Sequence, residues 1–152
     1  MRYHALSAAL ALLVLNILPA QAASSYRLSL DPVAYDNTTR EVIVGEGHLK
    51  ATLEGSTLTV SGDFSGLSSP ATTAKLGIGL DFGVPATEFF ATLTPSSAAS
   101  GSISGTITLT PAQVAALNKR QLFLQLSSVK GTDGSLWGWF EPANAAPSKG
   151  KK

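Results

Sequence analysis

Residues 49–64, LKATLEGSTLTVSGDF, decide the fold. On either side of the turn at 54–56, apolar side chains occupy every second position: Leu49, Ala51 and Leu53 before it, and Leu58, Val60, Gly62 and Phe64 after it. A period of two is typical of a β-strand with one buried and one exposed face. Two such strands joined by a short turn that contains glycine predict an antiparallel β-hairpin.

The same alternation recurs along the chain, with turn residues between the runs. It predicts further strands over residues 26–30, from near Arg40 to 54, and over 74–81, 88–94, 102–109, 122–127 and 136–140. Only Thr110-Pro111-Ala112-Gln113 is typical of a helix start, because threonine and glutamine three residues apart can form a capping box and proline suits the first helical position. We therefore expect an all-β sandwich or barrel with one short connecting helix near 111–119.

The first 22 residues are typical of a secretory signal peptide. Arg2 and His4 form a short polar region, an apolar run over 5–15 follows, and Ala20-Gln21-Ala22 provides the small residues that a signal peptidase reads. A membrane-spanning helix needs about 20 apolar residues, and this run ends sooner, at Asn16. We predict a signal peptide (1–22), one domain (23–142) and a disordered lysine-rich tail (143–152). The protein is expected to be extracytoplasmic, either periplasmic or secreted, with no membrane anchor after cleavage.

Charge and cysteine content limit the possible functions. The chain has 11 Lys and Arg residues against 10 Asp and Glu, and no cysteine. Without Arg2 and the terminal Lys149, Lys151 and Lys152, 7 basic residues face 10 acidic ones. This mildly acidic body has no basic face to neutralise phosphates, so nucleic acid is not an expected partner. Lack of cysteine excludes disulfides and thiolate chemistry, and stability must come from sheet packing.

Five blocks of sequence, in register with one another, resemble the CHRD (chordin-type) domain family. They are residues 66–74 (GLSSPATTA), 100–110 (SGSISGTITLT), 113–117 (QVAAL), 123–126 (FLQL) and 133–139 (DGSLWGW). The resemblance covers about residues 26–142. It implies an immunoglobulin-like or superoxide-dismutase-like Greek-key β-sandwich, of the kind found as free-standing exported proteins in bacteria.

Histidines carry the metal chemistry that this resemblance suggests. Many CHRD domains have a His-x-His strand and a third histidine on a later strand, an arrangement that could bind copper or another transition metal. The corresponding positions here are Lys75, Gly77 and Ser127, and none of them offers an imidazole. His48 is the one histidine that remains after signal cleavage. We therefore predict no metal site, no cofactor and no catalytic residue.

Aromatic residues near the C-terminus provide the sharpest functional hypothesis. Trp137 and Trp139 share one face of the last predicted strand, and Phe123 points outward from the strand before it. Exposed together, the three rings would form an aromatic platform that binds sugar rings or a partner protein. The alternative is that they pack at the core or rim of the sandwich.

Three functions follow from these observations. The leading hypothesis is a non-catalytic extracytoplasmic CHRD-like module that binds a protein or cell-envelope component through Trp137, Trp139 and Phe123. The alternative is a metal-binding or redox protein of the superoxide-dismutase type, which the residues at the family's histidine positions disfavour. A hydrolase that acts on envelope polymers would need a cleft in which His48 meets an acidic side chain and a serine.

Overall fold

The computed structural model describes residues 22–144. The predicted signal peptide (1–22) lies outside this range except for Ala22, and the predicted tail (143–152) lies outside it except for Ala143 and Asn144. Among the described residues, no helix is both long enough and apolar enough to cross a membrane. The expected all-β fold with one short helix is confirmed.

Strands of up to nine residues alternate with short turns along the described chain. In order, the elements are β1 (Ser24–Pro32), β2 (Glu46–Glu54), β3 (Thr57–Ser65), β4 (Ala71–Ile78), β5 (Phe89–Leu93), β6 (Gly101–Thr108), α1 (Pro111–Asn118), β7 (Leu122–Ser128), β8 (Leu136–Trp139) and β9 (Glu141–Pro142). The predicted capping box is present at the start of α1, where Gln113 N–H donates to Thr110 Oγ1 and Thr110 N–H donates to Gln113 Oε1.

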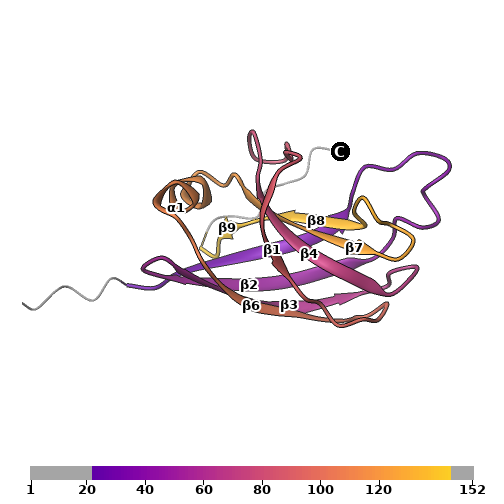
Figure 1. The fold of residues 1–152 in the computed structure, drawn as a ribbon, viewed down its shortest axis with the longest axis horizontal. Helices are drawn as coiled ribbons and strands as arrows, with labels where there is room; N and C mark the ends of the chain where they lie inside the picture. Colours follow the sequence, from indigo (N-terminus) through magenta and orange to yellow (C-terminus); the bar gives the residue numbers. More distant parts are fainter. Residues whose placement is uncertain (1–21, 145–152) are drawn as a thin grey trace, which may run out of the picture.

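The predicted hairpin over 49–64 is confirmed as β2 and β3. Leu53 pairs with Leu58 and Ala51 with Val60, so the apolar side chains of both strands lie on one face. Gly55 in the connecting turn has a φ of 61°, a conformation that glycine adopts without the steric cost that other residues incur. In Figure 1 the hairpin lies in the middle of the lower layer, between β1 and β6.

All the strands belong to one nearly closed antiparallel sheet. Neighbours follow the order β5-β4-β7-β8-β1-β2-β3-β6, and β9 pairs with β1. Strand β1 joins two layers, because its residue Leu30 pairs with Gly47 of β2 while the next residue, Asp31, pairs with Trp137 of β8 (Figure 1). Strand β7 returns to pair with β4. If β5 and β6 are counted as neighbours although they are not paired as strands, the spatial order is β7-β4-β5-β6, which is a Greek key.

The core lies between the two layers and consists mainly of leucines. The most deeply buried large side chains include Leu28, Leu30, Leu49, Leu58, Leu76, Ile103, Leu122, Leu124, Leu126 and Phe140. They come from six of the sheet's strands, from both layers, and from the residue that follows β8. Because the chain has no cysteine, burial of these side chains is the main source of its stability.

Leu58→Ala tests the importance of this core. Leu58 is 0% exposed, so its truncation should lower the free energy of unfolding by about 2–5 kcal/mol, as for other buried leucines. Thr59→Ala, one residue further along β3 on the exposed face, should cost less than about 1 kcal/mol. Urea denaturation of both variants checks this. Equal losses would contradict the assignment of faces.

The strand predicted from near Arg40 to 54 is present as β2, but its predicted start is wrong, since residues 37–43 form turns and β2 begins at Glu46. One carboxylate oxygen of Asp36 accepts hydrogen bonds from the amide and hydroxyl groups of both Thr38 and Thr39, at 2.6–3.0 Å. Arg40 N–H then donates to Asp36 O at 3.0 Å. An aspartate that bonds to the backbone just after it favours a turn over a strand.

These hydrogen bonds to the Asp36 carboxylate predict that the stability of the turn depends on pH. Those from Thr38, followed by those from Thr39, hold the pKa of the Asp36 carboxyl at about 2, below its ordinary 3.8. Because the folded-state pKa is lowered, the turn's stabilisation should be complete above the ordinary value and should be lost as the pH falls towards 2. An NMR titration of the carboxyl carbon checks this, and Thr38→Ala should raise the pKa. An unshifted titration in the unmodified protein would contradict it.

Candidate functional site

The three predicted aromatic residues meet on the outer face of the upper layer. Phe123 of β7 pairs with Trp139 of β8, and their rings are stacked with centroids 5.6 Å apart. Trp137 meets Trp139 edge-on, with centroids 5.3 Å apart. The alternation of β7 and β8 therefore brings the rings together as the sequence predicts.

Their exposure differs from the platform hypothesis. Phe123 is 0% exposed and Trp139 is 9% exposed, while Trp137 is half-buried. Two rings from an earlier part of the chain cover them: Phe89 lies 5.7 Å from Phe123, and Phe82 lies 6.0 Å from Trp139. The hypothesis of three exposed rings is therefore wrong for Phe123 and Trp139, and the alternative of packing describes these two, which belong to a small second core. We call Phe82, Phe89, Phe123, Trp137 and Trp139 the aromatic cluster.

Lys75 and Gly77, two of the positions that the resemblance matches to histidines, contact rings of this cluster. Gly77 pairs with Phe123, and a Cβ atom at residue 77 would lie 2.8 Å from Phe123 Cε1. The ammonium of Lys75 lies 5.5 Å from the centre of the Phe89 ring. Ser127 lies two residues beyond Gln125 and is buried. The ring of Phe123 therefore occupies the space that an imidazole at residue 77 would require.

A turn of the chain next to the cluster projects apolar side chains into solvent. The exposed fractions are 76% for Leu80, 37% for Phe82 and 46% for Val84. Among the described residues, only Tyr35 and Val129 are also large, apolar and exposed. We call Leu80, Phe82 and Val84 the apolar tip, because apolar exposure concentrated on one turn is typical of a contact surface.

The tip results from an early end of β4. The sequence predicts a strand over 74–81 with Leu80 in the core, but β4 ends at Ile78. Leu80 N–H donates to Val84 O and Val84 N–H donates to Asp81 O, both at 3.0 Å, so the chain reverses within five residues. Gly83 at the turn has a φ of 81°. The Asp81 carboxylate accepts the Phe82 N–H at 2.8 Å and fixes the turn further.

Arg120 also contacts the tip, through the ring of Phe82. Its guanidinium lies 4.3 Å from the centre of the Phe82 ring and forms an ion pair with Glu141, with Nη2 3.0 Å from Oε2. A cation stacked on an aromatic ring is attracted to the ring's electron density. Nothing in the local sequence indicates this role, because Arg120, Phe82 and Glu141 come from three separate elements.

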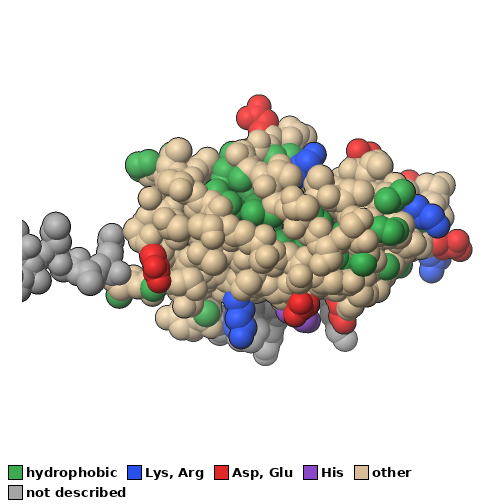
Figure 2. Space-filling view, turned by 60° about the horizontal axis from the view of Figure 1, so that its bottom comes forward, with side chains coloured by type: hydrophobic (Ala, Val, Ile, Leu, Met, Phe, Trp, Pro, Cys, Tyr) green, Lys and Arg blue, Asp and Glu red, His purple; other side chains and the backbone are tan. Residues whose placement is uncertain are grey.

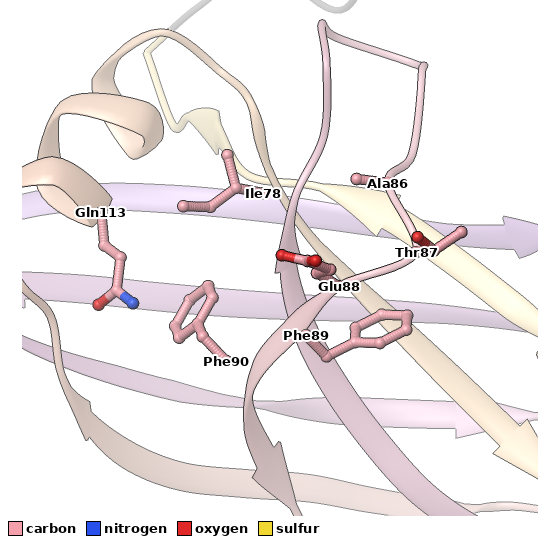
Figure 3. A pocket seen from close by; sticks show the side chains of 7 residues that line it. All are labelled: Ile78, Ala86, Thr87, Glu88, Phe89, Phe90 and Gln113. Atoms are coloured by element: carbon pink, nitrogen blue, oxygen red, sulfur yellow. The ribbon is translucent and has the colours of Figure 1, made fainter.

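A pocket of about 340 Å³ lies beside the tip, between the start of β5 and helix α1. Ile78, Ala86, Thr87, Glu88, Phe89, Phe90 and Gln113 line it. Figure 3 shows Phe90, Gln113 and Ile78 on one side of this space, with Phe89 directed away from them. Four of the seven lining side chains are apolar, and the other three provide a hydroxyl, a carboxylate and an amide. Such a combination is typical of sites that hold an apolar group and orient it with a few polar contacts.

His48 lies on the outer face of the lower layer, opposite Asp63 of β3. It lines a shallow depression of about 190 Å³ together with Asp63, Ser65, Glu46 and two neighbours. The hydrolase hypothesis requires such a meeting of histidine, acid and serine. No hydrogen bond joins these side chains to one another among residues 22–144, so the linkage between nucleophile and base that marks a catalytic triad is not formed.

Across residues 22–144, no three His, Cys, Asp or Glu side chains form a group that could hold a metal ion. Comparisons with known proteins found no matching family model, no matching curated protein and no matching solved structure.

Phe82→Ala tests whether the tip shields the aromatic cluster. In a Trp137→Phe background, Trp139 is the one tryptophan left, and loss of the Phe82 ring should increase the quenching of its fluorescence by acrylamide. Val84→Ala in the same background serves as the control, because no ring contact joins Val84 to the cluster. Equal quenching in the Phe82→Ala variant and its parent would contradict the shielding role.

Proposed function

We propose that this protein is a non-catalytic extracytoplasmic CHRD-like module that binds a protein or a cell-envelope component. One observation carries the proposal: three of the five large exposed apolar side chains among the described residues lie together on one projecting turn. Water contact at Leu80, Phe82 and Val84 is unfavourable, and a partner that covers them removes this cost.

The contact surface proposed here differs from the three-ring platform. Trp137, Trp139 and Phe123 do not reach the partner together, because Phe123 and Trp139 are buried and Trp139 packs against Phe82 of the tip. The ring contacts of Phe82 with Trp139 and Arg120 hold the turn in place. A surface that is already ordered loses little conformational entropy on binding, which favours affinity. Half-buried Trp137 lies at the margin of this surface.

The extracytoplasmic location rests on the sequence of residues 1–22, and the family assignment rests on the five blocks. A metal-binding or redox role would need imidazoles at the family's positions. The packing of Phe123 over Gly77 supports the binding module over that alternative, because the ring and an imidazole at 77 compete for the same space.

Leu80→Ser tests the proposal most cleanly, because Leu80 is the most exposed of the three and makes no ring contact. Tagged domain (23–152) is used to capture partners from an envelope extract of the producing cells. Loss of this apolar contact should weaken capture of a specific partner about tenfold or more. Trp137→Ala, at the margin, should weaken it less.

Val129→Ser is the matched control, since Val129 is 59% exposed and lies on a different turn. It changes exposed apolar area to a similar extent without touching the tip. The proposal fails if Leu80→Ser and Val129→Ser retain the same partner equally, or if the partner is lost in both.

A further inference from the structure

The sheet is left open between β5 and β6. Each of these strands is hydrogen-bonded as a strand to one neighbour, β5 to β4 and β6 to β3. At one end the two come together, where Ser96 N–H donates to Ser102 O at 2.9 Å and Ser102 N–H donates to Ser96 Oγ at 3.0 Å. Further along, the side chain of Leu93 fills the place of a Cβ atom at Gly105. Beyond that contact the strands are not paired.

The backbone groups at this opening can be assigned from the register. Ser102 directs its N–H and C=O towards Ser96 and away from β3, and Leu109 directs its N–H towards β3, where it donates to Ser56 O. Because alternate residues of a strand point their backbone groups the same way, Ser104, Thr106 and Thr108 also face the opening. No hydrogen bond to their backbone groups on that side occurs among the described residues.

A β-bulge in β5 lies beside the opening. The ladder between β4 and β5 is irregular at Leu76 and Gly77, which pair with Ala91 and Phe89, so that Phe90 is an extra residue in β5. Such a bulge bends its strand and ends regular pairing. Phe90 and Ile107 remain partly exposed there, and Phe90 also lines the 340 Å³ pocket. Figure 2 shows apolar side chains in the middle of the face that carries β3 and β6, with charges at its margins.

We propose that this opening binds an extended polypeptide, which pairs its backbone with Thr106 and Thr108 of β6 and places one apolar side chain in the pocket beside Phe90. An unpaired row of alternating donors and acceptors matches the backbone of a β-strand, and addition of a peptide strand to such an edge is a general mode of recognition. Strand β6, GSISGTIT, has no charge or proline that would discourage pairing.

The charge of Glu88 favours peptides that carry a basic residue. Glu88 lines the pocket, and the rest of its lining contains no lysine or arginine. A lysine or arginine next to the apolar residue of the peptide would therefore pair with the Glu88 carboxylate. A second copy that pairs through its own β6 fits less well, because this strand contains no lysine or arginine to pair with Glu88.

The experiment screens an immobilised library of random linear octapeptides against the domain (23–152). Binders should combine a large apolar residue with an adjacent lysine or arginine. When the tightest binder is resynthesised with N-methyl groups on alternate amides, one of the two patterns should weaken binding about tenfold or more, because it removes the N–H donors that face β6. Glu88→Gln should weaken binding of the basic peptides only.

Thr106→Pro removes the N–H at the free edge and should weaken binding to a similar extent, whereas Thr106→Val keeps the N–H and should retain it. If Thr106→Pro does not fold, the N-methyl peptides and Glu88→Gln still decide the question. Leu80→Ser should bind the peptides normally, so this test is independent of the one for the apolar tip. The proposal is overturned if no peptide binds, if neither N-methyl pattern matters, or if the domain alone forms a dimer that Thr106→Pro dissociates.

Discussion

An antiparallel sheet with one apolar face has to hide that face, and in this domain it does so by curving until its two halves pack against each other. Leucines from both layers fill the space between, and no disulfide assists them. Everything else on the surface follows from that closure. Because the curvature brings β5 and β6 together at one end and leaves them apart at the other, the molecule keeps an unpaired edge beside a pocket.

The parts of the fold that could be predicted from the sequence are those formed by residues close together in the chain. The hairpin of β2 and β3 follows from alternation and one glycine turn, and the helix start follows from Thr110 and Gln113. Asp36, with threonines two and three residues later, was an equally local signal for a turn, yet the strand was predicted to begin near Arg40. Short polar side chains that bond to the backbone outweighed alternation there.

The candidate site is formed by contacts between residues far apart in the sequence, and no local sequence pattern predicts such contacts. Alternation correctly placed Phe123 on the outer face of β7, but it could not indicate that Phe89 and Phe82 would cover that face. In the same way, Leu80 continues the alternation of β4 and was therefore expected in the core. A turn closed by Leu80 and Val84 sends it into solvent instead. Phe123 and Trp139, on the outer face, are buried by other rings, and Leu80, which alternation placed in the core, is exposed.

The position of β1 has a consequence for the order in which the chain can assemble. It pairs with β2, which follows it closely, but also with β8 and β9, which lie more than a hundred residues later. When the chain emerges from the ribosome with its N-terminus first, β1, β2 and β3 can meet early. Pairing of β1 with β8 and β9 has to wait until residues 136–142 have emerged. Until then, the apolar side of the early hairpin stays uncovered, which leaves it open to wrong contacts before folding is complete.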